Sequence, residues 1–207
     1  DQGVKELILV AQETTVYGQD IYGEKSLHKL LKELCQIKGI RWIRLLYCYP
    51  EEITEELVQT IKTEKKICHY LDLPIQHCND DILKRMGRKT TQADLREKIS
   101  MLRKEIPDIA LRTTLISGFP GETNKNHEEC VDFVANMKFE RLGVFPYSPE
   151  EGTPAAGYDR QLPEEIKQEW ADEIMQTEQN VIFAQNEEMI GRRFSVIVDG
   201  YLPEDGV

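Results

Sequence analysis

The sequence has no run rich in lysine or arginine, and its 26 basic residues are outnumbered by 37 acidic ones, for a net charge of −11 over 207 residues. Gripping many phosphates requires clustered cations, so we expect no extensive nucleic-acid surface. No apolar stretch reaches the roughly 18 residues that span a bilayer, and no signal segment opens the chain. These absences predict a cytoplasmic protein without membrane contact, for which a positively charged partner is the easiest to accommodate.

Closely spaced cysteines are also missing. The chain has five cysteines, an odd number with no close pair, which argues against a disulfide framework and against a zinc knuckle. We expect most of them to be buried as small apolar groups. They are Cys35, Cys48, Cys68, Cys78 and Cys130.

The sequence does not begin with methionine, and it ends in a turn soon after a predicted strand at Phe194–Val198. Both ends are therefore expected to be cuts in a longer protein. A hydrophobic content of 40% over this length is ample for one buried core and short for two full domains.

Apolar runs typical of buried strands alternate with segments whose apolar residues recur at helical spacing. Connections of that length favour right-handed crossovers between parallel strands, so the predicted class is α/β. An open doubly wound sheet and a (β/α) barrel both remain possible, and both place ligands at the carboxyl ends of the strands. Strands are predicted at 7–11, 43–49, 70–75, 110–117 and 142–147, and helices at 26–39, 53–63, 91–106, 123–138 and 163–188, with Ser26, Asn79 and Thr123 as expected caps.

Polar residues follow several of these strands. Gln12, Glu13 and Thr14 come after the first strand and could hold a small polar ligand, although polar loops are ordinary there. His77 and Cys78 follow the third strand, but adjacent strand residues point apart and no second ligand pair is spaced to join them, so no metal is expected.

Arg112, near the start of the fourth strand, is either a surface charge, which we favour, or an inward fork for a carboxylate.

The stretch "LISGFPGET" places Gly118, Pro120 and Gly121 between a strand and a helix. So bare a backbone could approach a flat or charged group beside the free N–H groups of the helix, or it could be a tight turn needed for packing. The fifth strand, in "VFPYSPEEGTP", ends beside it with Phe145 and Tyr147. Two neighbouring apolar strand ends favour a slot for a planar ring.

Three segments, "LDLPIQHCNDDILKRMGR", "LISGFPGET" and "FPYSPEEGTPAA", resemble the radical S-adenosylmethionine methylthiotransferases, and "VAQETTVYGQDIYG" resembles their RimO-type subgroup, which modifies a ribosomal protein. The resemblance covers nearly the whole chain. It implies an incomplete TIM-type barrel over residues 1–188 that binds S-adenosylmethionine, followed by the beginning of a TRAM domain over 189–207. An acidic enzyme also suits a basic small-subunit ribosomal protein better than tRNA.

The resemblance further implies roles for individual residues, each matched by its place in these segments. The first-strand motif would meet the methionine amino group, and the third-strand end the methionine or ribose portion. The fourth- and fifth-strand ends would hold the adenine, and replacing Gly118 with a bulky residue would abolish turnover but leave the fold intact. The implied ligand residues are Gln12, Glu13, Thr14, Gln76, Arg112 for the carboxylate, Ile116, Ser117, Gly118, Phe145 and Tyr147.

The sequence departs from the family in lacking the CxxxCxxC loop that holds a [4Fe–4S] cluster. The intact protein is expected to carry two such clusters and to take electrons from a donor such as flavodoxin or ferredoxin, whereas the residues given ligate neither cluster. As it stands the chain is expected to be an inactive part of an enzyme that adds a methylthio group to an aspartate. The alternatives are a tRNA-modifying methylthiotransferase and a cluster-free barrel acting as a binding module.

Overall fold

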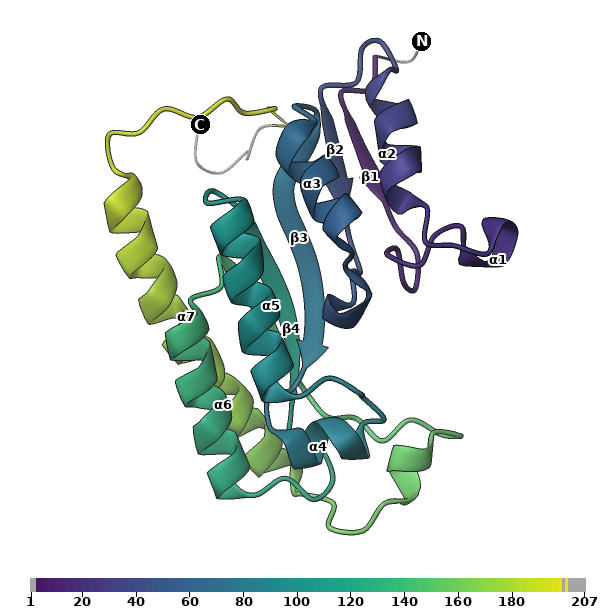
Figure 1. The fold of residues 1–207 in the computed structure, drawn as a ribbon. Helices are drawn as coiled ribbons and strands as arrows, with labels where there is room; N and C mark the ends of the chain where they lie inside the picture. Colours follow the sequence, from purple (N-terminus) through teal and green to yellow (C-terminus); the bar gives the residue numbers. More distant parts are fainter. Residues whose placement is uncertain (1–2, 199, 201–207) are drawn as a thin grey trace.

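The computed structural model describes residues 3–198 and 200, which form one sheet of five parallel strands in the order β1-β2-β3-β4-β5 (Figure 1). The strands are β1 (Glu6–Leu9), β2 (Trp42–Leu45), β3 (Ile67–Gln76), β4 (Ala110–Ser117) and β5 (Arg141–Pro146). The helices are α1 (Gln19–Tyr22), α2 (Leu27–Cys35), α3 (Glu55–Thr63), α4 (Asp80–Arg85), α5 (Gln92–Glu105), α6 (Asn124–Met137) and α7 (Glu164–Met189), with short 3₁₀ turns η1 (Pro50–Glu52) and η2 (Pro154–Gly157).

The strand order decides between the two closures that the sequence leaves open. Each strand adds to the same side of its predecessor, whereas a doubly wound sheet reverses direction partway. Right-handed crossovers that never reverse place their helices on one face of the sheet. The structure is therefore an open segment of a (β/α) barrel, which confirms the incomplete barrel.

The two faces of the sheet differ in burial. In β4 the side chains of Leu111, Thr113, Leu115 and Ser117 are buried beneath the helices, and those between them are only half-buried. We call the helix-free side the bare face. Four of the five cysteines are buried on the covered side and Cys68 is half-buried, as expected.

Side-chain caps start most of the longer helices. Asn79 accepts hydrogen bonds from two amides of α4, and Thr91 and Thr123 form capping boxes at α5 and α6. Ser26 occupies the N-cap position of α2 as predicted, but its hydroxyl donates to the Glu24 carbonyl (3.2 Å) and makes no side-chain cap bond with the helix.

In the helix predicted at 163–188, the spacing of Ile166, Trp170 and Ile174 predicts a shared face. Trp170 and Ile174 are buried on α7 as that spacing predicts, but in the first turn the buried residue is Lys167 and Ile166 is only half-buried. Lys167, Trp170 and Ile174 follow the i, i+3, i+7 spacing of one helix face, which packs on β5 and α6.

The strand predicted at Phe194–Val198 is not formed: residues 194–198 have no regular structure, and the side chains of Phe194, Val196 and Val198 are exposed. Among the described residues no strand lies there to pair with them. The predicted second domain, 189–207, lies partly outside the described residues, at 199 and 201–207. No helix in the described part of the chain has the length and apolar character needed to cross a membrane.

Candidate functional site

The carboxyl ends of β3 and β4 meet at a cavity of 460 Å³. Gln76 and Ile116, both predicted ligand residues, line it together with Phe119 and Tyr158. Gln76 ends β3 in a left-handed conformation (φ 71°), and the pairing of β3 with β4 shifts register between Leu73 and Gln76. The structure thus brings two predicted residues from neighbouring strands to one concave site.

Three cations that we did not single out from the sequence, Lys84, Arg85 and Arg88, also line this cavity. Arg85 donates to the Pro120 carbonyl (2.9 Å) and pairs with Asp159 (3.1 Å). Within the described residues, no side-chain hydrogen bond or ion pair is formed by Lys84. The run "LKRMGR" was the signal, since three cations so close together after a strand can concentrate positive charge at a rim.

At the end of β1, Glu13 is held in place by its neighbours. One carboxylate oxygen accepts from the Thr15 amide (2.9 Å), the Thr15 hydroxyl and the Tyr49 amide (3.3 Å). The other oxygen is buried without a partner among the described residues. Burial raises the pKa of Glu13, against the two backbone hydrogen bonds. An oriented carboxylate oxygen without a partner fits a ligand ammonium group.

The neighbours of Glu13 behave differently from it. Thr14 is buried, and its hydroxyl donates to the Leu46 carbonyl (2.6 Å), so it ties β1 to β2 instead of presenting a free hydroxyl. Gln12 is exposed. Glu13 and Thr14 line a second hollow of 570 Å³ along β1, separate from the cavity that Gln76 and Ile116 line.

The turn after β4 is anchored to the end of β3 by a buried pair. The Glu122 carboxylate accepts from the Phe119 amide (3.0 Å) and from His77 Nε2 (3.1 Å), and both side chains are at most 1% exposed. The other His77 nitrogen accepts from the Asn79 amide (3.0 Å), which places the ring proton on Nε2.

His77 also lies near Cys78 and Cys130, with one ligand atom of each within 4.8 Å of the others. The expectation that His77 and Cys78 point apart is wrong, because β3 ends at Gln76 and Cys130 joins them from α6. Both His77 nitrogens are already hydrogen-bonded, so the trio is a packed cluster with no free ring nitrogen for a metal.

Ser117 and Gly118 face α7. The Ser117 hydroxyl donates to the Lys167 carbonyl (2.8 Å), and a Cβ on Gly118 would lie 2.3 Å from Lys167 Cγ. The bare turn therefore lies against Lys167 on its covered side, and only its backbone can face a ligand. Gly118 has φ 71°, so a side chain would be strained there as well as crowded.

The two predicted residues of the fifth strand, Phe145 and Tyr147, lie in different surroundings. Phe145 is 58% exposed on the bare face, whereas Tyr147 is buried with its ring edge-on to Phe119 (5.1 Å between centroids). The Tyr147 amide donates to the Ser117 carbonyl (2.8 Å), which joins the ends of β4 and β5.

Arg112 points to the bare face, not to the outer surface that we favoured. Its guanidinium pairs with the buried Asp72 carboxylate (2.5 Å). It lies five residues before the end of β4, about 16 Å at the usual strand rise. A ligand carboxylate would have to compete with Asp72, and the role of Arg112 stays a prediction.

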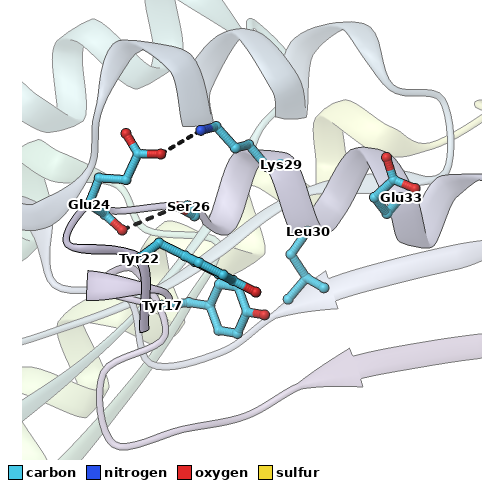
Figure 2. A pocket seen from close by; sticks show the side chains of 7 residues that line it. All are labelled: Tyr17, Tyr22, Glu24, Ser26, Lys29, Leu30 and Glu33. Carbon is cyan, nitrogen blue, oxygen red and sulfur yellow. Dashed lines mark hydrogen bonds and ion pairs between the residues drawn. The ribbon is translucent and has the colours of Figure 1, made fainter. Parts of the chain in front are cut away.

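A further hollow, of 320 Å³, lies beside α2 and holds none of the predicted residues (Figure 2). Tyr17 and Tyr22 form one wall and Leu30 another, and Lys29 pairs with Glu24 (2.5 Å) at its edge. It therefore does not belong to the strand-end site.

An open barrel segment with ligand-facing residues at the carboxyl ends of its strands defines a class of cofactor-binding (β/α) proteins. Residues 1–134 match the radical SAM superfamily, and the chain belongs to that superfamily. It is 58% identical over 205 residues to the ribosomal protein uS12 methylthiotransferase RimO of Lachnoclostridium phytofermentans, covering 99% of this chain and 47% of the relative. The protein of the same name from Clostridium botulinum is 55% identical over 199 residues, 96% of this chain and 45% of the relative.

These similarities confirm the resemblance found in the sequence, and the chain spans about half the length of those relatives. Solved radical SAM structures share the fold at low identity. The methyltransferase TsrM from Kitasatospora setae matches with a TM-score of 0.54 at 18% identity, covering 70% of this chain and 28% of that one. Coproporphyrinogen III oxidase from Escherichia coli matches with a TM-score of 0.52 at 20% identity, covering 76% of this chain and 36% of that one.

The superfamily implies S-adenosylmethionine and a [4Fe–4S] cluster. The buried, partnerless Glu13 oxygen fits the amino group of the former, and the concave cavity at Gln76 and Ile116 fits its nucleoside part. Within the described residues no three cysteine sulfurs gather, so these residues do not fit the cluster.

Proposed function

We propose that this chain is the S-adenosylmethionine-binding part of a cytoplasmic methylthiotransferase that modifies an aspartate of ribosomal protein uS12. The 58% identity to a uS12 methylthiotransferase over 99% of the chain is the observation that carries the proposal. The net charge of −11 supports a basic protein as substrate and disfavours the tRNA alternative.

In this proposal the strand ends divide the cofactor between them. Glu13 binds the amino group, with Gln12 and Thr14 beside it, and Gln76 meets the methionine or ribose. Arg112 is the candidate partner of the carboxylate, which is bonded to the same carbon as the amino group and would compete there with Asp72. Ile116 to Gly118 and the Phe145–Tyr147 backbone hold the adenine.

When bound, S-adenosylmethionine and a reduced cluster supply the radical chemistry and the methyl group. We propose that the intact protein carries two [4Fe–4S] clusters on residues outside this chain and takes its electrons from a donor such as flavodoxin or ferredoxin. We further propose that residues 189–207 are the beginning of a TRAM domain. The residues of this chain bind and orient the cofactor.

The test uses the full-length protein with reconstituted clusters, S-adenosylmethionine, a reductant and recombinant uS12. Mass spectrometry should find one methylthio group replacing a hydrogen on an aspartate of uS12, and none when that aspartate is replaced by asparagine. If tRNA gains a methylthio group and uS12 does not, the proposal is wrong.

A binding measurement tests the site separately from turnover. Glu13→Gln should weaken S-adenosylmethionine binding about tenfold, since it removes a charge-assisted hydrogen bond. The exposed Glu24→Gln, which touches no strand end, is the control. Equal affinities in the two variants would remove Glu13 from the site.

A further inference from the structure

Lys167 is a lysine whose ammonium group is held inside the protein. It lies in the first turn of α7, is 2% exposed, and donates from Nζ to the Tyr147 carbonyl (3.0 Å). Its one ion-pair partner in the described structure is Glu164 (2.5 Å), whose side chain is 72% exposed. Burying an ammonium group costs free energy that burying an apolar side chain of similar length does not. The Lys167 ammonium therefore needs its hydrogen bond to the Tyr147 carbonyl.

The same residue contacts the neighbouring strand end at two more points. Its carbonyl accepts from the Ser117 hydroxyl (2.8 Å), and its side-chain stem occupies the place where a Cβ of Gly118 would stand, 2.3 Å from Cγ. Lys167 therefore touches Ser117 and Gly118 on β4 and Tyr147 on β5. Beyond β5 the sheet has no further strand among the described residues, so α7 is the element that packs on these ends from that side.

Lys167 does not line the cavity at the strand ends. Lys167 contacts Ser117, Gly118 and Tyr147 from the side that faces α7. The opposite side of these residues is the one proposed to contact the adenine. A hydrogen bond to the Tyr147 carbonyl fixes the orientation of the peptide that follows β5, and the packed stem fixes how close α7 approaches Gly118. A ligand that reads backbone groups of both strands depends on their spacing.

We propose that Lys167 is a positioning residue: it sets the separation and peptide orientation of the β4 and β5 ends, and thereby the affinity for the adenosyl group, without touching it. The proposal rests on the proposed function, because the ligand is the one proposed for that rim. The competing explanation is that Lys167 only fills the space between α7 and the sheet.

Lys167→Met separates the two explanations, because methionine keeps an unbranched stem against Gly118 but cannot donate to Tyr147. In the full-length protein we expect this variant to raise the dissociation constant for S-adenosylhomocysteine, measured by calorimetry, by about tenfold, the usual effect of losing a hydrogen bond from a charged donor. Glu164→Gln, which removes only the exposed partner, should stay within about twofold. Lys167→Arg keeps a charged donor and should recover much of the loss.

Amide hydrogen exchange without ligand gives a second readout. Lys167→Met should speed exchange at Tyr147, whose amide bonds to Ser117, and leave α5 unchanged. Unchanged affinity and unchanged exchange would make Lys167 a filler and overturn the proposal, as would equal losses in Lys167→Met and Glu164→Gln.

The two proposals fail in different ways. If the full-length protein binds neither S-adenosylmethionine nor S-adenosylhomocysteine, the proposed function is wrong, and the exchange at Tyr147 still decides whether Lys167 braces the strands. If Lys167→Met does not fold, Lys167→Leu, which also lacks a donor, carries the same comparison.

Discussion

The two ends of the proposed cofactor rim are held in different ways. At β1, the Glu13 carboxylate binds the Thr15 amide two residues away, and Thr14 bonds to the adjacent strand. At β4 and β5, the support is Lys167, which lies 50 residues after Ser117 and comes from a helix that follows the whole sheet. The first end is therefore held by contacts with the neighbouring strand β2 and the loop that follows it, and the second depends on the docking of α7.

The two buried charges also differ in what remains available to a ligand. Glu13 leaves one carboxylate oxygen without a partner in the described structure, whereas the Lys167 ammonium is bonded to Tyr147 and Glu164. One end of the rim can accept a ligand group directly, and the other supplies rigid backbone. The predictions below test this contrast, from the largest expected effect to the smallest.

Gly118→Ala should destabilise the full-length protein by about 3 kcal/mol or more, because the new methyl group meets Lys167 and the left-handed backbone is strained. This replaces the expectation that the fold would tolerate a bulky residue there. Gly152→Ala is a matched control, since Gly152 also has positive φ (82°) but open space around it, and it should cost only about 1 kcal/mol. Thermal midpoints measure both, and similar shifts would show that α7 does not press on the turn.

The docking of α7 should also depend on pH through Glu178. Its carboxyl is 3% exposed on the buried stripe of α7, and both oxygens lack partners in the described structure. Burial, with a smaller effect of Glu140 against the opposing Arg141, raises its pKa from 4.5 to about 7. The pKa of Glu178 is higher in the folded protein than in the unfolded chain. The protonated carboxyl therefore contributes its full stabilisation below about pH 4.5. The free energy of unfolding falls by about 3 kcal/mol as the pH rises through about 7.

Glu178→Gln should remove that slope, so that the variant is the more stable protein at pH 8. The measurement is the thermal midpoint at pH 5 and pH 8, with the exposed Glu165→Gln as control. Parallel pH profiles for the wild type and Glu178→Gln would contradict the prediction.

At the β1 end, Thr14→Val should cost about 1 to 2 kcal/mol, since it leaves the Leu46 carbonyl without its hydroxyl donor. Thr63→Val removes a similar hydrogen bond from an exposed position on α3 and should cost less. The midpoint difference between the two variants tests whether Thr14 holds β1 to β2. A loss at Thr63 as large as that at Thr14 would count against that role.

The smallest effect is expected for Glu164→Gln, at most about 0.5 kcal/mol, because the Glu164 side chain is 72% exposed and the Lys167 ammonium keeps its hydrogen bond to Tyr147. Thermal midpoints at low and high salt should nearly coincide with those of the wild type. A loss above about 1 kcal/mol would mean that the Lys167 ammonium depends on the surface carboxylate more than on the Tyr147 carbonyl.

Local signals in the sequence were enough to find much of this structure. The strand at Ala110–Ser117 and the caps at Asn79 and Thr123 follow from periodicity and side-chain chemistry within a few residues. Gln76 and Ile116 could be placed together because the carboxyl ends of neighbouring parallel strands meet. Such rules depend on neighbours in the chain or on topology alone.

The features that escaped prediction depend on tertiary contacts. Lys167 occupies a stripe position where an isoleucine next to it was expected, and only the presence of Gly118 opposite makes room for its stem. Arg112 lies on the bare face, where it pairs with Asp72 of the adjacent strand, and Cys130 of α6 lies next to His77. A helix pattern shows which face is buried but not which side chain from elsewhere meets it.

The bare face of the sheet has a consequence for association between molecules. Among the described residues this face has an uncovered surface that includes Ile8 and Phe145, both about half-exposed or more. On the same face, Glu6 pairs with Arg44 (2.7 Å) and Asp72 with Arg112 (2.5 Å). A second sheet that stacked there would have to desolvate the partly exposed charges of Glu6, Arg44 and Arg112, so these pairs disfavour aggregation through this face.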